Sequence, residues 1–464
     1  MIKDLAGLIS FETTLGKAED GAPFGRKIAD ALEFMLGRAE DYGLEVVNKQ
    51  KYGYCQYSGS NTDDEIVGAL CHLDVVPAGE LHKWDSNPFE LAIRDGIMYG
   101  RGVTDNKGAA VAVLHALKRL KDNGVKLKRH ARLIFGCNEE TDMSCIKAYV
   151  KEQTMPVCSF VPDADFPIIN SEKGILQFEM IFPVSALARC IDISGGFRAN
   201  MIPETSKVLI KKGNPVYDKL KSLDGDKLSQ VLDNPQLLQQ CSLKELASGF
   251  EIVANGVSGH AMAPHKGRNA ILMNFALLAE ITNDLKGVDD ERLLFKLNRL
   301  FSDEEFKLQA GLIVDCPDSG NLTLNPGLVC IEDDNLHLTV DARLPRILND
   351  ELLLAKVEQA LAQLDLRAHL KVKEYKPGLF VAKDDPLVET LLSIYTKHTG
   401  LPGTCIKSGG GTYARQLTNA VAFGTRFVGV KTDIHSPNEQ YPQADFYKLV
   451  DIYYDAFVEL CSQG

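Results

Sequence analysis

Seven acidic and histidine residues occur at positions where carboxylates and imidazoles could meet in the folded chain. Most of them directly follow a run of residues that is predicted to form a buried strand. They are His72, Asp74, Asp105, Glu139, Glu140, Asp163 and His435. Hard carboxylate oxygens mixed with imidazole nitrogens suit Zn²⁺, Mn²⁺ or Co²⁺. A two-metal site needs one carboxylate to bridge the ions and another to carry a proton, and this set supplies both.

The elements that must position these residues are strands joined by helices. Residues 65–76 and 131–136 form apolar runs that predict buried strands, and residues 108–123 between them predict an amphipathic helix. Strand, helix and strand in succession predict a right-handed crossover and a mainly parallel sheet. Open sheets of this kind bind ligands at the carboxyl ends of their strands. His435 is predicted to follow another strand, at 421–430.

Each group also has a simpler explanation. His72 and Asp74 have i, i+2 spacing, which points both side chains to the same side of a strand. They could simply be a hydrogen-bonded pair that binds no metal. Glu139 and Glu140 could be solvated surface residues. Asp105 could be only the N-cap of the following helix. Their joint placement at strand ends favours the metal site.

The order of elements predicts a fold in which one domain interrupts another. We expect an α/β catalytic domain with a mainly parallel sheet, formed by residues 1–176 and 377–464. We expect residues 177–376 to form an inserted α+β lid domain, because the chain becomes more polar and alternating there. Two strand-then-helix units are predicted inside it, at 250–281 and 336–364.

Composition narrows the class of protein. The 464 residues suffice for two or three domains, with 45% hydrophobic and 25% charged residues. A net charge of −12 and the lack of a basic run argue against nucleic acid or anionic lipid as a partner. The sequence contains neither the roughly 20-residue apolar stretch of a membrane span nor a signal-peptide pattern. Eleven scattered cysteines without a C-x-x-C pair fit reduced thiols, so we expect a cytoplasmic protein.

Several separated segments together resemble a known family. They are HLDVVPAG, WDSNPFE, DGIMYGRGVTDNKG, CNEET, PDADFP, GGGTYAR and HSPNE. In this order, over nearly the whole chain, they resemble the M20 family of di-zinc metallopeptidases. The long insertion, PDADFPIINSEKG and GGGTYAR most resemble the PepV-type dipeptidases of bacteria.

The resemblance implies a role for each residue of the site. His72 and Asp163 would hold one metal ion, Glu140 and His435 would hold the other, and Asp105 would bridge them. The two ions would be zinc, with manganese or cobalt as alternatives. Asp74 would accept a hydrogen bond from the second ring nitrogen of His72. The peptide bond between Asp105 and Asn106 would be cis.

The resemblance also implies a mechanism. The two ions would share a water molecule and make it acidic, and Glu139 would be the general base that takes its proton. Glu139 would then deliver that proton to the departing amine.

The remaining predicted contacts concern the substrate. His260, in GVSGHAMAPHKGRNA, matches a family histidine that reaches over the metals, and Arg343, in VDARLP, matches an arginine that binds the substrate's carboxylate. Asn321 is a further candidate contact. Backbone amides of Gly409, Gly410 and Gly411 could hold the same carboxylate. GGGTYAR lacks the spacing of a P-loop, which argues against a nucleotide site.

The resulting hypothesis is a metal-dependent dipeptidase that cleaves dipeptides with free amino and carboxyl ends. In many relatives the overlying histidine comes from a second subunit. This insertion is about double theirs, so we expect a monomer. An N-acyl amino acid deacylase, of the acetylornithine or succinyl-diaminopimelate type, would use the same metal residues and is one alternative. A catalytically silent binding module is the other.

Overall fold

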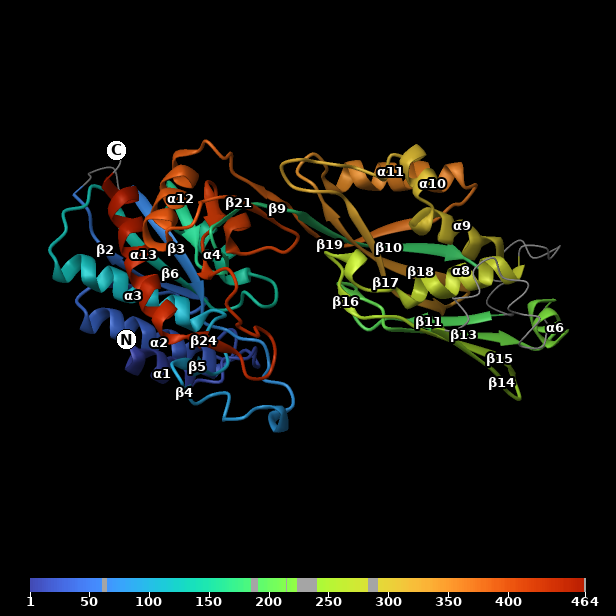
Figure 1. Ribbon diagram of the computed structural model, residues 1–464, viewed down its shortest axis with the longest axis horizontal. Coiled ribbons are helices and arrows are strands. Elements are labelled where there is room, and N and C mark those ends of the chain that lie inside the picture. Colours follow the sequence, from blue (N-terminus) through green and yellow to red (C-terminus); the bar gives the residue numbers. More distant parts are fainter. Residues whose placement is uncertain (61–64, 185–190, 214, 223–239, 283–290, 463–464) are drawn as a thin grey trace. The chain divides into compact units, whose positions relative to one another are not determined.

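The chain folds into two compact units. The computed structural model describes residues 1–60, 65–184, 191–213, 215–222, 240–282 and 291–462. Unit 1 comprises Met1–Glu172 and Leu379–Gly464, and unit 2 comprises Lys173–Gly378 (Figure 1). The sequence predicts these two divisions after residues 176 and 376. The α/β class with an inserted α+β domain is confirmed.

Unit 1 is built on a nine-stranded sheet in the order β1-β2-β6-β3-β7-β22-β9-β20, with β21 paired to β9. Its strands are β1 (Glu45–Asn48), β2 (Tyr52–Tyr57), β3 (Ile66–His72), β6 (His130–Gly136), β7 (Cys158–Val161), β9 (Ile168–Glu172), β20 (Leu379–Phe380), β21 (Cys405–Ser408) and β22 (Ala420–Ala422). The central strands β6, β3, β7 and β22 are parallel. The strands β1 and β2 at one side and β20 at the other pair antiparallel. The sheet is therefore parallel where the predicted site lies and mixed at its margins.

Helices cover both faces of this sheet. They are α1 (Ile2–Ile9), α2 (Arg26–Asp41), α3 (Lys107–Asp122), α4 (Ser144–Glu152), α12 (Pro386–Thr399) and α13 (Gln443–Ser462). Side chains alternate along β2: Gly53 faces Leu32 and Leu36 of α2, whereas Tyr52 and Tyr54 meet Tyr149 of α4 edge-on. Because both faces are covered, all seven residues of β3 are buried, which explains its nearly continuous apolar sequence.

The ends of α12 follow from its sequence. Asp385 is the N-cap, and its carboxylate accepts a hydrogen bond from the amide of Leu387. Pro386 occupies the first helical position, where no backbone donor is needed. Gly400 ends the helix in the left-handed conformation, at φ +71°. These local signals place α12 and its packing surface.

Short strands hold the loops of unit 1. β4 (Ala92–Arg94), β5 (Ile97–Tyr99) and β24 (Gln440–Pro442) form one small sheet, and β8 (Ala164–Asp165) pairs with β23 (Thr425–Arg426). The strand predicted at 421–430 is wrong in extent, because β22 ends at Ala422 and β23 covers only Thr425 and Arg426. Gly424 separates them with a positive φ of 76°.

Unit 2 is built on an eight-stranded antiparallel sheet in the order β14-β15-β13-β11-β17-β18-β10-β19. Its strands are β10 (Gly174–Pro183), β11 (Ile191–Gly195), β13 (Thr205–Lys211), β14 (Cys241–Glu245), β15 (Gly249–Asn255), β17 (Thr323–Glu332), β18 (Asn335–Leu344) and β19 (His369–Lys376). A separate pair joins β12 (Met201–Ile202) to β16 (Gly259–His260).

The described helices of unit 2 pack with the apolar face of its sheet in a core of their own. They are α6 (Pro215–Ser222), α8 (Ala270–Thr282), α9 (Glu291–Ser302), α10 (Glu304–Gln309) and α11 (Asp350–Gln363). Buried and half-buried residues alternate along β10, so that Leu176, Phe178 and Met180 point into this core. Both predicted strand-then-helix units are confirmed, as β15 with α8 and β18 with α11.

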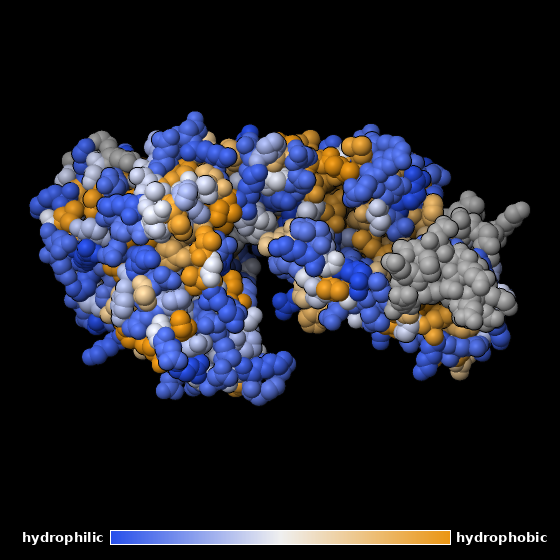
Figure 2. All heavy atoms as spheres, viewed as in Figure 1, coloured by the Kyte–Doolittle hydropathy of each residue, from blue (hydrophilic) through white to orange (hydrophobic). Residues whose placement is uncertain are grey.

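The surface mixes residue types. On the face shown in Figure 2, hydrophobic residues occur in small groups between hydrophilic ones. Among the described residues, the helices are all too short or too polar to cross a bilayer.

Candidate metal centre

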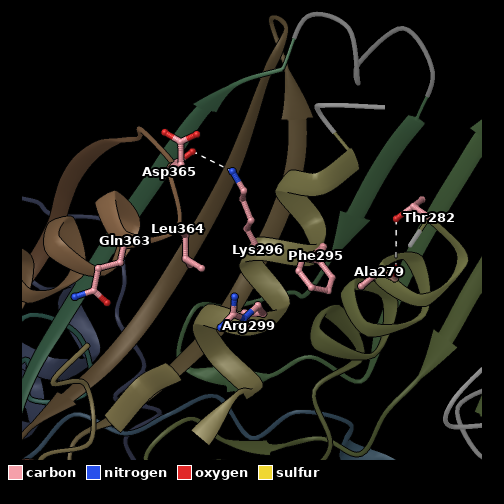
Figure 3. A pocket seen from close by; sticks show the side chains of 8 residues that line it. All are labelled: Ala279, Thr282, Phe295, Lys296, Arg299, Gln363, Leu364 and Asp365. Atoms are coloured by element: carbon pink, nitrogen blue, oxygen red, sulfur yellow. Dashed lines mark hydrogen bonds between the residues drawn. The ribbon is translucent and has the colours of Figure 1, made fainter. Parts of the chain in front are cut away.

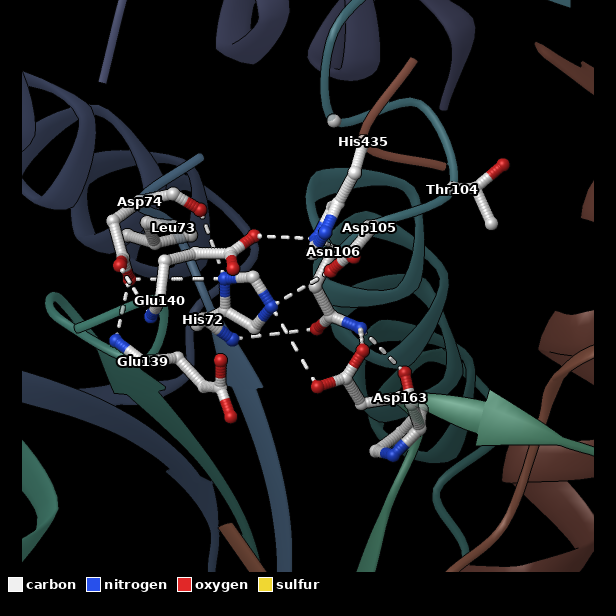
Figure 4. A network of polar contacts seen from close by, with 12 residues as sticks. His72, Leu73, Asp74, Thr104, Asp105, Asn106, Glu139, Glu140, Asp163 and His435 are labelled. Carbon is white, nitrogen blue, oxygen red and sulfur yellow. Dashed lines mark hydrogen bonds and ion pairs between the residues drawn. The ribbon is translucent and has the colours of Figure 1, made fainter. Parts of the chain in front are cut away.

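The predicted metal ligands of unit 1 converge at one edge of the sheet. His72 is the last residue of β3, Glu140 follows β6, and Asp163 follows β7. These three strands are parallel, so their carboxyl ends lie side by side. Asp105 comes from the loop before α3, and His435 comes from the loop before β24 rather than from a strand end (Figure 4).

Asp105 lies between two histidines and offers one oxygen to each. Its Oδ1 is 2.9 Å from Nε2 of His72, and its Oδ2 is 3.0 Å from Nε2 of His435. A second carboxylate approaches each imidazole: Asp163 Oδ2 lies 3.6 Å from His72, and Glu140 Oε1 lies 3.2 Å from His435. The site thus consists of two histidine–carboxylate pairs joined by one shared aspartate (Figure 4).

Asp74 supports this arrangement differently from the expected way. The Nδ1 of His72 is hydrogen-bonded to the main-chain oxygen of Asp74 at 2.8 Å, while the Asp74 carboxylate is 3.7 Å away. That carboxylate instead accepts hydrogen bonds from the amides of Glu139 and Glu140, both at 3.0 Å. Asp74 is only 3% exposed. It therefore fixes both the ring of His72 and the backbone that carries the two glutamates.

Asn106 also organises the site, although its role was not predicted from the sequence. Its Oδ1 accepts a hydrogen bond from the amide of His72 at 3.3 Å. Its Nδ2 donates to the main-chain oxygen of Pro162 at 2.6 Å and to Asp163 Oδ1 at 3.2 Å. The peptide bond between Asp105 and Asn106 is cis, as the resemblance implied. Asn106 is the N-cap of α3 without a side-chain capping bond, so Asp105 does not cap the helix.

Electrostatics keep protons on the histidines when no cation is bound. Burial lowers the pKa of His72, but Asp105 and Asp163 outweigh it and leave the pKa well above its usual value. Hydrogen bonds to Asp105 and Glu140 raise the pKa of His435 to about 10. Burial raises the pKa of Asp105, but its hydrogen bonds to the two histidines outweigh burial, so the pKa lies below its usual value. Burial and the charge of Asp105 raise the pKa of Asp163 to about 8.

Glu139 differs from the residues around it because its side chain does not join the network. Its carboxylate points away from His435 and lies below His72 in Figure 4. Burial raises its pKa well above the usual value, and the charges of Asp163, Glu140 and Asp74 add to this. An ionised carboxylate with a raised pKa is a stronger proton acceptor, as a general base requires.

The residues present fit divalent cations. Ligand atoms of His72, Asp105 and Glu140 lie within 4.8 Å of one another, and so do those of His72, Glu139 and Asp163. Glu140 Oε1 is a buried oxygen that faces Nε2 of His435 at 3.2 Å. Burying several carboxylates beside one another is costly unless cations compensate their charge. Mixed imidazole and carboxylate donors suit zinc, manganese or cobalt.

The Gly409–Gly411 turn belongs to unit 1 and is held by buried charges. Glu172 accepts hydrogen bonds from the amide and hydroxyl of Thr412 and from Nε of Arg415. The Nη2 of Arg415 donates to the main-chain oxygen of Gly410 at 3.0 Å. A Cβ at Gly411 would overlap this guanidinium, so a larger residue there would displace Arg415. The amide of Gly410 already donates to Ser408 Oγ at 3.0 Å.

The other predicted substrate contacts lie in unit 2. Arg343 is 3% exposed, and Asp341 binds its Nε at 2.7 Å and its Nη2 at 3.2 Å. His260 lies on β16, and its pKa is lowered by burial and by the charge of Arg343, which places the two residues in one electrostatic environment. Lys173 Nζ donates to the main-chain oxygen of Asn321. Lys173 and Asn321 line a pocket of about 620 Å³.

A second pocket in unit 2 contains none of the predicted residues. It measures about 390 Å³ and opens between α8, α9 and the end of α11 (Figure 3). Its Lys296 donates to the main-chain oxygen of Asp365 at 3.1 Å, and its Arg299 binds Asp303 at 3.2 Å. These cations are therefore engaged by the protein itself.

Comparison with known proteins identifies relatives along nearly the whole chain. The family model for peptidase families M20, M25 and M40 matches residues 69–459. A Bacillus subtilis (strain 168) protein named "Putative dipeptidase YtjP" is 33% identical over 462 residues. The match covers 97% of this chain and 93% of that protein.

Solved structures share the fold at lower identity. The M20 family metallo-carboxypeptidase Sso-CP2 from Sulfolobus solfataricus has a TM-score of 0.57 and 16% identity, with full coverage of both chains. Human carnosine dipeptidase 1 has a TM-score of 0.57 and 13% identity, with coverage of 100% of this chain and 96% of the other.

Proposed function

Because this chain belongs to peptidase family M20/M25/M40, we propose that it is a metal-dependent dipeptidase. Its substrates are dipeptides with a free amino end and a free carboxyl end. The observation that carries the proposal is the position of Asp105, whose two oxygens face two separate histidine–carboxylate pairs. The name of the Bacillus subtilis relative supports the same substrate class.

Two divalent cations, zinc first and manganese or cobalt as alternatives, are the proposed cofactors. His72 and Asp163 would hold one, Glu140 and His435 would hold the other, and Asp105 would serve both. When bound, such ions polarise a carbonyl oxygen and lower the pKa of water. The carboxylates around both imidazoles support this assignment, because their negative charge favours a cation beside each ring.

The chain's own residues complete the reaction. Glu139 accepts a proton from the attacking water at its carboxylate and returns it to the departing amine. Asp74 holds the amides of Glu139 and Glu140 and so sets where these two carboxylates begin. His72 keeps its orientation through the main-chain oxygen of Asp74.

A small set of residues is proposed to recognise the substrate. Arg343 binds the terminal carboxylate through its planar guanidinium, whose orientation Asp341 fixes. The Gly409–Gly411 turn and Asn321 are further contacts to the substrate, and His260 donates to the oxygen on which negative charge develops.

A cellular compartment and an oligomeric state are also proposed for the enzyme. We place it in the cytoplasm as a monomer, without nucleic-acid or membrane partners. The ten cysteines among the described residues are free thiols, which supports a reducing compartment. Size-exclusion chromatography with light scattering tests the monomer, and a dimer mass would contradict it.

A substrate panel tests the proposed reaction. Metal-loaded protein is assayed with unblocked dipeptides, β-alanyl dipeptides, and N-acetyl and N-succinyl amino acids. We expect hydrolysis of the unblocked dipeptides, and Glu139→Gln protein prepared in parallel controls for contaminating peptidases. Hydrolysis of the acylated compounds alone would identify a deacylase instead. Lack of hydrolysis across the panel would favour a binding module.

A further inference from the structure

Glu439, the last residue of HSPNE, is buried immediately before β24. Its side chain is 1% exposed, yet it has no assigned role in the reaction. Its carboxylate accepts four hydrogen bonds: from Arg101 Nη1 at 2.8 Å and from the amides of Gly102 at 3.0 Å, Thr104 at 3.0 Å and Asp105 at 3.1 Å. All four donors belong to one loop, so a single carboxylate determines its backbone path.

That loop ends at the aspartate that joins the two histidine–carboxylate pairs. The amide of Asp105 itself donates to Glu439, and the amide of Thr104 donates to the same oxygen. The main chain therefore enters Asp105 in a fixed orientation. A shift of this amide would move both oxygens that face His72 and His435.

Glu439 also lies close in sequence to His435, which precedes it by four residues in the same segment. Its side chain is 50% exposed, so packing alone does not hold it. Its segment also contains three non-glycine residues in the left-handed region, at Asp433, His435 and Asn438. Such a backbone persists only where surrounding contacts maintain it. The amide of Gln440 donates to Thr432, and Glu439 anchors the segment beside Asp105.

Arg101 extends the connection to a third loop. It is 1% exposed and also donates from Nη2 to the main-chain oxygen of Pro77, in the loop that follows β3. The guanidinium lies 5.2 Å from the ring of Trp84. Arg101 and Glu439 thus tie together the segments that carry His72, Asp105 and His435.

A buried carboxylate so close to Asp105 is costly. Glu439 loses its hydration on burial, and Arg101 and the backbone amides offset only part of that loss. An apolar residue of similar size would avoid this cost if the only task were packing. The arrangement therefore indicates that the four accepted hydrogen bonds themselves are needed.

We propose that Glu439 is a positioning residue that sets the spacing of Asp105 and His435 for cation binding. The inference rests on the proposed metal centre. Second contacts of this kind typically change metal affinity about 10- to 100-fold when removed. Glu439→Gln keeps the size of the side chain but leaves one acceptor oxygen and turns an amide group toward N–H donors.

The test measures Zn²⁺ affinity by competition with a chromophoric chelator in the absence of substrate. Wild type and Glu439→Gln are compared with Glu179→Gln, a matched control in unit 2 whose carboxylate is 12% exposed and paired with His337 and Lys373. Visible spectra of the Co²⁺-loaded proteins report the geometry around the ion. Apo-protein unfolding temperatures separate a loss of affinity from a loss of stability.

We expect Zn²⁺ affinity to fall at least tenfold in Glu439→Gln, with an altered Co²⁺ spectrum, and to stay within twofold of wild type in Glu179→Gln. At saturating metal, kcat for dipeptides falls while KM stays within twofold. Affinity within twofold of wild type in Glu439→Gln, or an equal loss in the control, would overturn the inference. A wild type that binds Zn²⁺ but cleaves no dipeptide would refute the proposed reaction and leave this comparison intact. A wild type that binds none of Zn²⁺, Mn²⁺ and Co²⁺ would refute both.

Discussion

Replacing Asp74 with asparagine removes a contact that supports the metal site and leaves the proposed metal ligands unchanged. The Asp74 carboxylate accepts hydrogen bonds from the amides of Glu139 and Glu140, each at 3.0 Å. Asparagine retains one acceptor oxygen, so one of the two amides loses its partner and faces an NH₂ group. A hydrogen bond to a charged group contributes about 1.5–3 kcal/mol, and a buried unsatisfied amide costs a similar amount.

We therefore expect Asp74→Asn to lose about 2–3 kcal/mol of support for the placement of Glu139. If this loss appears in the transition state, kcat falls about 30- to 150-fold. The assay is dipeptide hydrolysis at saturating zinc, with metal content measured on the same sample. Asp4→Asn is the matched control, because Asp4 is equally buried but binds Arg38, Tyr42 and His115 instead.

Two results would refute this reasoning. Asp74→Asn protein with more than half of the wild-type kcat would mean that the two amide contacts do not position Glu139. An equal loss in Asp4→Asn would mean that any buried aspartate contributes through general stability.

Substitutions at Glu139, Arg343 and Asp4 test three other parts of the structure. Glu139→Gln should bind the same number of metal ions as wild type but lose roughly 100- to 10,000-fold in kcat, and retention of a tenth of the rate would contradict its role as base. Arg343→Lys should raise KM for dipeptides about 10- to 100-fold with little change in kcat, because a single ammonium replaces a planar fork, and an unchanged KM would remove it from carboxylate binding. Burial raises the pKa of Asp4, but bonds from Tyr42 and His115 outweigh it and lower the pKa below 3.8. Its folded form thus binds fewer protons than the unfolded chain, and the stability it contributes above that pH is lost as the pH falls. Asp4→Asn should therefore flatten the acid limb of the unfolding free energy, and an identical acid limb would contradict this.

The part of the site formed at strand ends could be predicted from the sequence. β3 is buried on both faces and therefore reads as one apolar run, which made its end, at His72, visible. The same reasoning located Glu139 and Glu140 after β6. Parallel pairing then brings these ends together, because the register of β3 on β6 places His72 opposite Gly136.

Contacts between distant loops could not be predicted in this way. Glu439 bonds to amides that precede it by more than 330 residues, and no periodicity encodes such a pairing. The same holds for Asn106, whose side-chain amide group bonds both His72 and Asp163. A signal was present for Glu439, since it stands in a segment quoted for the resemblance, but a carboxylate in a loop gives no indication of burial.

Local geometry also redirected two expectations. The second ring nitrogen of His72 is hydrogen-bonded to the main-chain oxygen of Asp74, because the Asp74 carboxylate already accepts hydrogen bonds from two backbone amides. His435 does not follow a long strand, because the extended backbone is interrupted at Gly424, between β22 and β23. Sequence patterns report the burial of a strand better than the path of the loop after it.

The central claim is that two cations held by His72, Asp105, Glu140, Asp163 and His435 are needed for amide cleavage. The most direct test titrates chelator-treated protein with Zn²⁺ while metal content and hydrolysis of an unblocked dipeptide are measured together. The account predicts no turnover in the metal-free protein and a rate that reaches its plateau at two bound ions per chain. Full turnover at less than a tenth of an ion per chain would contradict it.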